Sequence, residues 1–181
     1  MTARTPPYEK TIALVGLMGV GKSSIGRRLA GALGLPFKDA DTEIEAAAGR
    51  SISEIFALFG EPAFRDGERR VIGRLLDEPP HVLATGGGAF AQDETRALIK
   101  EKAISVWLKA DLEVLARRVG RRDHRPLIAG KDPLEVLRAH ERDRYPAFQT
   151  ADIVVETGDA AHQVAVDAIL KALADHAKKT A

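Results

Sequence analysis

Residues 16–23 read GLMGVGKS, which matches the pattern G-x-x-x-x-G-K-[ST], and they follow an apolar run with β-branched residues. Glycines let the backbone curl so that successive N–H groups point at phosphate oxygens, and the helix expected next adds its positive N-terminus. Lys22 supplies a cation for the β- and γ-phosphates, and Ser23 a hydroxyl for Mg²⁺. This segment, here named the phosphate loop, predicts a nucleoside triphosphate site. The alternative, a glycine-rich turn with a chance Lys-Ser pair, is strongly disfavoured because all four fixed positions are present in the right context.

Apolar β-type runs alternate with helical patterns along the rest of the chain. The expected strands cover residues 11–16, 36–41, 81–85, 104–109 and 152–157. The expected helices cover residues 22–33, 42–48, 63–76, 92–101, 112–119, 133–145 and 160–177. Such alternation is typical of a parallel sheet covered by helices on both faces. We therefore expect a three-layer α/β/α domain of about five parallel strands, with ligands bound at the carboxyl ends of the strands.

Composition excludes several classes of protein. The chain has 181 residues, the size of one domain, and 27 Lys plus Arg against 26 Asp plus Glu. That balance excludes a polybasic nucleic-acid coat, and the absence of cysteine excludes disulfides, thiolate metal sites and a cysteine nucleophile. The longest apolar stretch, residues 12–21, is only half of the roughly 20 residues that span a membrane. We expect a cytoplasmic monomer with a loose leader over residues 1–10 and no membrane or nucleic-acid partner.

Two carboxylates, Asp39 and Asp41, end the second expected strand. Residues two apart share a face of a strand, so both are expected to face the phosphate loop. One carboxylate is then suited to the Mg²⁺ shell, and the other to a substrate hydroxyl, which it orients or deprotonates. The alternative is that Asp41 caps the helix over residues 42–48 and that Asp39 is a solvated loop residue. The phosphate loop favours the functional interpretation.

Two further segments offer groups to a small anionic substrate. Arg65 and Glu68 lie three residues apart on an expected helix and can form an ion pair that holds Arg65 toward an anion. A solvated surface pair remains open, because periodicity does not separate Arg65 from its neighbouring arginines. Glycines 86–88 directly follow the third expected strand. Either a ligand approaches their backbone closely or the chain makes a tight turn there, and spacing does not separate the two.

An arginine-dense segment follows the expected helix over residues 112–119. It holds five arginines between residues 117 and 125, and Pro126 excludes a continuous helix. A basic loop of this kind is typical of a lid that closes over phosphates, with a solvated loop as the alternative. Further on, Arg142 and Arg144 are two residues apart, so only one of them is expected to face a site on the same helix.

Taken in order, GLMGVGKS at 16–23, DAD at 39–41, FRDGE at 64–68, GGG at 86–88, RPL at 125–127 and RYP at 144–146 resemble the shikimate kinase family over essentially the whole chain. The resemblance implies a P-loop fold like that of the nucleoside monophosphate kinases. The implied fold is a single domain over residues 1–181, with a substrate-binding region at 42–76 and a lid at about 120–131. It also implies phosphorylation of the 3-hydroxyl of shikimate by ATP with Mg²⁺, in aromatic amino-acid biosynthesis.

The resemblance assigns roles to particular residues. Lys22, Asp41 and Arg125 are implied in catalysis, and Ser23 and Asp39 in Mg²⁺ binding. Shikimate is expected to contact Asp41, Arg65, the backbone N–H of Gly87, and Arg144. Nucleotide binding is implied for Gly19, Val20, Gly21, Lys22, Ser23, Ser24, Arg117 and Arg125. Arg117 is expected to stack on adenine, although variation in lid length leaves Arg118 as an alternative.

One departure and two alternatives remain. The family carries R-x-P-x-Y where this chain has Arg144 followed by Phe148, so the aromatic ring is kept without its hydroxyl. Another small kinase, such as a gluconate kinase, would share the phosphate loop but is less expected to combine it with DAD, FRDGE and GGG. A nucleotide-dependent switch is the other alternative, but the N-K-x-D element of guanine-specific switches is absent from the sequence.

Overall fold

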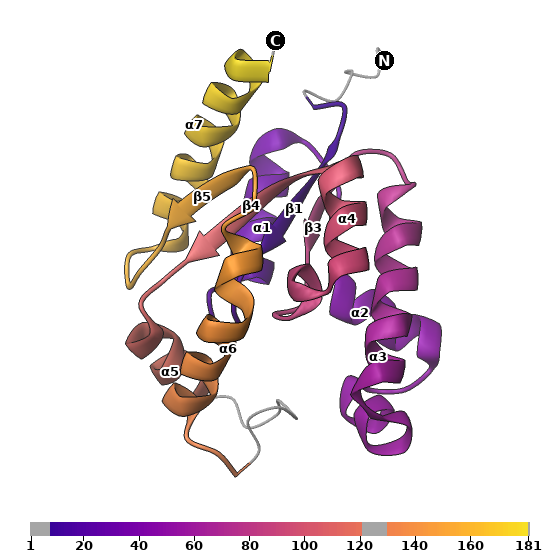
Figure 1. Cartoon of the computed structure of the whole chain (residues 1–181). Coiled ribbons are helices and arrows are strands. Elements are labelled where there is room, and N and C mark those ends of the chain that lie inside the picture. The colour runs from indigo at the N-terminus through magenta and orange to yellow at the C-terminus, as the bar shows by residue number, and fades with distance from the viewer. Residues whose placement is uncertain (1–7, 121–129, 181) are drawn as a thin grey trace.

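The computed structural model describes residues 8–120 and 130–180. Within these residues, five strands form one parallel sheet in the order β2-β3-β1-β4-β5 (Figure 1). The strands are β1 (Thr11–Val15), β2 (Phe37–Asp39), β3 (Val82–Ala84), β4 (Ala103–Lys109) and β5 (Ile153–Glu156). The predicted parallel α/β fold is confirmed. β1 and β3 are buried along their full length, as expected for strands covered on both faces.

Helices cover both faces of the sheet. They are α1 (Lys22–Leu33), α2 (Ala40–Ala48), α3 (Ile52–Leu76), the 3₁₀ turn η1 (Ala89–Ala91), α4 (Asp93–Lys102), α5 (Leu112–Gly120), α6 (Pro133–Phe148) and α7 (His162–Thr180). α1 and α7 pack together on one face, while α3, α4 and α6 lie toward the other (Figure 1). None of the helices in the described residues is both long and apolar enough to cross a membrane.

Helix α3 is longer than the sequence pattern predicts. It begins at Ile52 rather than at residue 63, after Ser51 caps it by accepting a hydrogen bond from the N–H of Glu54 at 3.1 Å. Gly60 interrupts it with a φ of 82°, and Pro62 follows directly. These two residues break the helical periodicity, so only the part of α3 beyond them was recognisable. The first part of α3 forms a wall of the site described below.

Helix α6 also extends beyond its expected end, through Pro146 to Phe148. The Phe148 ring is fully buried, with its centroid 5.6 Å from that of Trp107 and 6.4 Å from that of Phe90. These contacts outweigh the hydrogen bond that a proline removes from a helix. The ring lies in an apolar core, where a hydroxyl would need a partner, so the phenylalanine is well suited to this position.

The carboxyl ends of three strands are tied together at the end of the sheet opposite the first and last described residues (Figure 1). Thr85 follows β3, and both its hydroxyl and its backbone N–H donate to the carbonyl of Leu14 in β1, at 2.8 and 3.2 Å. The turn of residues 86–88 therefore begins beside the phosphate loop. β2 pairs with β3 on the other side, with Asp39 opposite Ala84.

Replacing Gly16 with alanine is expected to destabilise the fold. A Cβ at this position would lie 2.6 Å from the backbone oxygen of Leu108, and the φ of Gly16 is 146°. We expect a loss of about 2 kcal/mol or more in the free energy of unfolding in urea. Gly31, where no atom lies within 4 Å of an added Cβ, is the matched control. Gly31→Ala should be neutral or stabilising, by up to about 1 kcal/mol. Equal stabilities for the two variants would contradict this account.

Candidate active site

The phosphate loop has the backbone that anion binding requires. Gly19 and Gly21 have φ values of 85° and 97°, which favour glycine. Gly21 is the N-cap of α1, and no side chain caps the helix there. The ammonium group of Lys22 donates to the carbonyls of Gly16 at 2.5 Å and Leu17 at 3.1 Å, so its side chain lies across the loop. The loop thus presents a helix N-terminus and a lysine to one point.

A cavity of about 300 Å³ opens at this loop. Ser23 and Asp39 line it together, and the Ser23 hydroxyl donates to Asp39 Oδ2 at 2.5 Å. Among the described residues, no cluster of three or more His, Cys, Asp or Glu side chains is placed to hold a metal ion. One hydroxyl and one carboxylate instead suit Mg²⁺, which keeps waters and takes further ligands from substrate phosphates. We name this space the donor cavity. Its lining residues are Met18, Gly19, Gly21, Lys22, Ser23, Ser24, Asp39, Asp41, Thr85, Gly86, Gly87, Arg118, Val119 and His162.

The two aspartates do not lie along one strand as the sequence suggested. Asp39 ends β2 and is the N-cap of α2, where its Oδ1 accepts from the N–H groups of Asp41 at 3.0 Å and Thr42 at 3.3 Å. Asp41 lies in the first turn of α2. The strand stops because the Asp39 carboxylate satisfies the free N–H groups of the helix. The expectation of a shared strand face was therefore wrong, although both side chains line the donor cavity.

A second cavity of about 440 Å³, here named the acceptor cavity, adjoins the first. The two cavities share Met18, Asp41, Gly86 and Gly87. The remaining walls come from α2, α3, the glycine turn and α6. They are Glu45, Ser51, Ile52, Ser53, Phe56, Phe64, Arg65, Glu68, Gly88 and Arg144. Asp41 thus lies at the junction of the two cavities.

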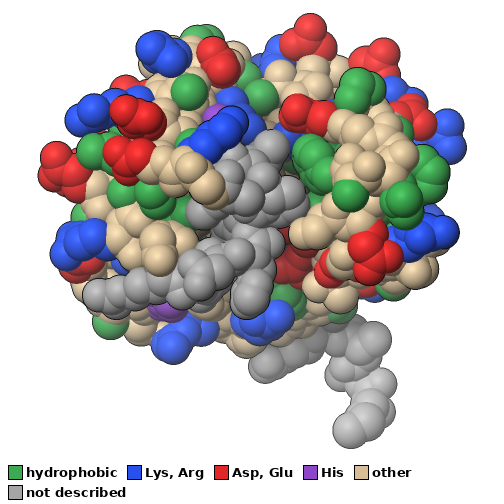
Figure 2. Space-filling view, turned by 90° about the horizontal axis from the view of Figure 1, so that it is seen from below, with side chains coloured by type: hydrophobic (Ala, Val, Ile, Leu, Met, Phe, Trp, Pro, Cys, Tyr) green, Lys and Arg blue, Asp and Glu red, His purple; other side chains and the backbone are tan. Residues whose placement is uncertain are grey.

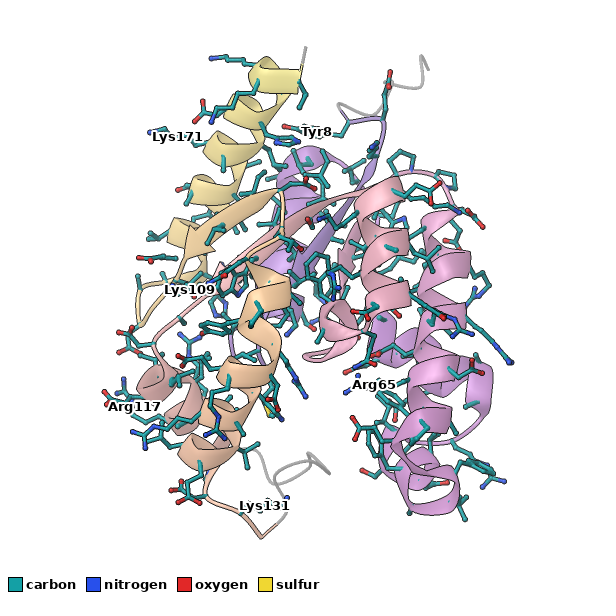
Figure 3. The ribbon with its side chains drawn as sticks, in the orientation of Figure 1. Tyr8, Arg65, Lys109, Arg117, Lys131 and Lys171 are labelled. Carbon is teal, nitrogen blue, oxygen red and sulfur yellow. The ribbon has the colours of Figure 1, made fainter. Side chains whose placement is uncertain are left out.

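Arg65 is held by a buried partner in the acceptor cavity. Its Nη1 donates to Glu68 Oε1 at 2.9 Å, and its Nη2 to Glu61 at 3.3 Å. Glu68 has 0% exposure, and its pKa is raised by burial against the lowering effect of Arg65. The i, i+3 pair predicted from the sequence is therefore present, and it is buried rather than solvated. Figure 3 shows Arg65 extending from α3 toward the middle of the molecule.

The second arginine of the acceptor cavity is Arg144, not Arg142. Arg144 is 8% exposed and lines the cavity, whereas Arg142, two residues away, is exposed. Burial and then the nearby Arg65 lower the pKa of Arg144 to about 10, against the opposing effect of Glu61 and Glu68. Two guanidinium groups thus face the same cavity and repel one another, and an anion bound between them would relieve this repulsion.

The three glycines after β3 leave room for these side chains. A Cβ on Gly86 would lie 3.0 Å from Glu68 Oε2 and 3.2 Å from Asp41 Oδ1. A Cβ on Gly88 would lie 2.5 Å from Nη2 of Arg65. None of the three has a positive φ. Close side-chain approach therefore favours glycine at positions 86 and 88, whereas an added Cβ on Gly87 would first meet the backbone N of Met18, at 3.2 Å. The sequence interpretation did not include this crowding by side chains.

Arg118 and Arg117 occupy different positions on α5. Arg118 lines the donor cavity and donates to the carbonyls of Gly19 at 3.2 Å and Gly158 at 2.6 Å. Arg117 instead pairs with Asp159 at 3.0 Å, is 63% exposed, and lies on the outer side of α5 (Figure 3). The geometry thus favours Arg118, the alternative, as the arginine nearest a nucleotide. Arg125 lies outside the described residues, as does most of the expected lid.

Several lining residues were missed in the sequence. Ser51 caps α3, and Ile52 and Phe56 come from its first part; the S-x-x-E spacing of Ser51 and Glu54 is the signal that could have revealed this helix start. His162 lines the donor cavity from the start of α7, and no motif marks it. The face of the molecule seen from below displays positive and negative side chains interspersed (Figure 2).

Comparison with known proteins identifies the family. The family model described as shikimate kinase matches residues 18–174, which include the phosphate loop from Met18 onward and both cavity-lining arginines of the acceptor cavity. The chain belongs to the shikimate kinase family. It is 74% identical to a shikimate kinase of Caulobacter vibrioides strain NA1000 / CB15N over 168 residues, covering 93% of this chain and 84% of that protein.

Solved structures agree with the fold. A shikimate kinase from Acinetobacter baumannii in complex with shikimate has a TM-score of 0.89 and 37% identity, covering 92% of this chain and 93% of that one. A gluconokinase from Sinorhizobium meliloti also matches, with a TM-score of 0.67 and 22% identity over 96% of each chain. An identity of 22% shows only a common fold. The family match therefore supports the resemblance to shikimate kinases and not the alternative of a gluconate kinase.

Acid is expected to destabilise the protein through His140, which lies one helical turn before Arg144. Burial, followed by Arg144, lowers the pKa of His140 to about 4 from its ordinary 6.5. As the pH falls, the unfolded chain binds this proton first, so stability is lost from about pH 6.5 down to about pH 4. We expect urea unfolding to show a loss of about 2 kcal/mol from this residue between pH 7 and pH 4.5.

The matched variants are His140→Gln and His176→Gln, each of which removes one histidine. His140→Gln should show a flatter dependence of stability on pH, whatever its stability at pH 7. His176→Gln should follow the wild type. Identical pH dependence in wild type and His140→Gln would overturn the assignment.

Proposed function

We propose that the protein transfers the γ-phosphoryl group of ATP to the 3-hydroxyl of shikimate, giving shikimate 3-phosphate and ADP, in aromatic amino-acid biosynthesis. The observation that carries this proposal is the junction of the two cavities. A phosphate-binding loop and two arginines, of which Arg144 is buried and Arg65 is 12% exposed, open onto spaces that share Asp41 and the glycine turn. Family membership and the shikimate-bound relative support the same acceptor.

ATP with Mg²⁺ is proposed to occupy the donor cavity. The N–H groups of Gly19, Val20, Gly21, Lys22, Ser23 and Ser24 would surround the phosphates at the N-terminus of α1. Lys22 would supply positive charge to the transferring group, and Ser23 and Asp39 would hold Mg²⁺, which neutralises phosphate charge. Arg118 replaces Arg117 as the proposed neighbour of the adenine ring. Arg125 remains the proposed lid arginine, on sequence grounds alone.

Shikimate is proposed to occupy the acceptor cavity with its carboxylate between Arg65 and Arg144. Guanidinium groups form paired hydrogen bonds with a carboxylate, and burial strengthens such contacts. The ring hydroxyls would then face Asp41 and the backbone N–H of Gly87 at the junction. This orientation carries a hydroxyl toward the γ-phosphate while the carboxylate stays in the far part of the acceptor cavity.

The reaction itself demands placement more than covalent chemistry. The hydroxyl oxygen bonds to the γ-phosphorus as the bridging bond to ADP breaks, and the hydroxyl loses its proton. Asp41, at the junction, is proposed to orient the hydroxyl and to accept that proton. Residues 42–76 would form the substrate-binding region, and residues 120–131 the lid. All proposed site residues come from one chain, so a monomer suffices, and the proposed location is the cytoplasm, which supplies ATP.

A coupled assay of ADP release tests the proposal. Purified protein with Mg·ATP should release ADP when shikimate is added and not when gluconate is added. Gluconate-dependent release without shikimate-dependent release would instead favour the other kinase. Tight nucleotide binding with no response to either acid would favour a nucleotide-dependent switch.

Asp41→Asn is expected to fold normally and to lower kcat by about 100-fold or more, because the amide neither accepts a proton nor carries the charge that orients the hydroxyl. Lys22→Met should also abolish most transfer. Initial-rate assays at saturating shikimate and ATP measure both effects. Near-native kcat in Asp41→Asn would remove this residue from the catalytic machinery.

Arg65→Ala is expected to raise the KM for shikimate by about 30-fold or more, because a buried charged hydrogen bond to the carboxylate is lost. The matched control is Arg69→Ala, one helical turn further along α3. Arg69 pairs with Asp66 at 2.6 Å and Glu94 at 2.7 Å and does not line either cavity. A normal KM in Arg65→Ala, or an equal increase in Arg69→Ala, would contradict the proposed carboxylate site.

A further inference from the structure

His162 lies at the donor cavity and has no part in the function proposed above. It is the first residue of α7, and its side chain is one of the cavity walls. Its Nε2 would lie 3.5 Å from a Cβ on Gly21, so the imidazole rests against the phosphate loop. Gly21 caps the N-terminus of α1, the point at which nucleotide phosphates are proposed to bind. A titratable ring therefore stands beside a proposed polyphosphate site.

Cations from two different helices act on this ring. Burial lowers the pKa of His162 below its ordinary 6.5, and Arg28 of α1 and Arg118 of α5 lower it further. Among the described residues, no carboxylate contributes to this shift. The surroundings of His162 in the free protein therefore disfavour its charged form, while the ring rests against the phosphate loop.

Phosphates would reverse this balance. A bound nucleoside diphosphate brings at least two negative charges to the N-terminus of α1, and these favour the charged form of the nearby imidazole. We propose that nucleotide binding is coupled to proton uptake by His162, so that the affinity for ADP increases as the pH falls. This inference rests on the proposed nucleotide site.

The direction follows from linkage. Consider a group whose pKa is higher in the complex than in the free protein. Its protonation strengthens binding fully at pH values below its pKa in the free protein, and this gain in affinity is lost as the pH rises through its pKa in the complex. The attraction between a protonated imidazole and a phosphate charge several ångströms away, near a protein surface, corresponds to a gain of about threefold to tenfold in affinity for the nucleotide. The effect should therefore appear on the acid side of pH 7.

Isothermal titration of ADP between pH 5.5 and pH 8.5, without Mg²⁺, tests the coupling. The ADP phosphate titrates in the same range, so the informative quantity is the ratio of Kd for His162→Gln to Kd for the wild type. This ratio should increase by about threefold to tenfold from pH 8 to pH 5.5. His176→Gln, which removes a histidine near the other end of α7, is the matched control and should keep a constant ratio to the wild type.

Two further measurements do not depend on the His162 variant. Titrations in buffers of different ionisation enthalpy count protons directly, and the wild type should take up more protons per ADP bound than His162→Gln does. Arg28 is exposed and lies outside the cavity lining, so Arg28→Gln leaves the cavity walls in place. Removing this cation should move the proton-linked gain in affinity to higher pH.

The outcomes separate this inference from the proposed function. A constant Kd ratio for His162→Gln, together with equal proton uptake, would overturn the inference and leave the nucleotide site intact. An unshifted pH dependence in Arg28→Gln would also count against it. If ADP does not bind the wild type at any pH, the proposed nucleotide site itself fails, and the inference fails with it.

Discussion

A buried carboxylate beside two guanidinium groups determines the layout of the acceptor cavity. Glu68 is fully buried and fixes Arg65 at 2.9 Å, while Arg144 approaches from α6 with 8% exposure. The cavity lining also includes Asp41 and Glu45, but the nearby Arg65 lowers the pKa of Arg144, so the two guanidinium groups repel one another where they face the cavity. The glycine turn follows from the same constraint, since a Cβ on Gly88 would lie 2.5 Å from Arg65. The proposed substrate carboxylate would complete this arrangement.

The sheet brings this charge cluster to the phosphate loop. β3 lies beside β1, and Thr85 ties their carboxyl ends together through Leu14, so the glycine turn and the loop become neighbours. Asp39, at the end of β2, lines the donor cavity. Because Asp39 caps α2, Asp41 lies in the first turn of that helix, where the two cavities meet. Short hydrogen-bonded connections between buried strands thus position the groups that phosphoryl transfer requires.

Local patterns were sufficient for part of this site. The phosphate loop and the Arg65–Glu68 pair are set by residues close in sequence, and both were predicted. The choice of Arg118 over Arg117 was not, because one residue turns a helix by about 100° and the pattern does not fix which side faces the cavity. His162 reaches the donor cavity only through the packing of α7, a tertiary contact that leaves no signal in a single sequence. The fold was easier to predict than the site, since the alternation of strands and helices along the sequence constrains it strongly.

The central claim is that Arg65 and Arg144 bind the carboxylate of the acceptor. The most direct measurement compares kcat/KM for shikimate with kcat/KM for its methyl ester, which keeps the ring hydroxyls but lacks the negative charge. The account predicts that the wild type disfavours the ester by about 100-fold or more, and that Arg65→Ala loses most of this discrimination. Equal kcat/KM values for acid and ester in the wild type would contradict the account.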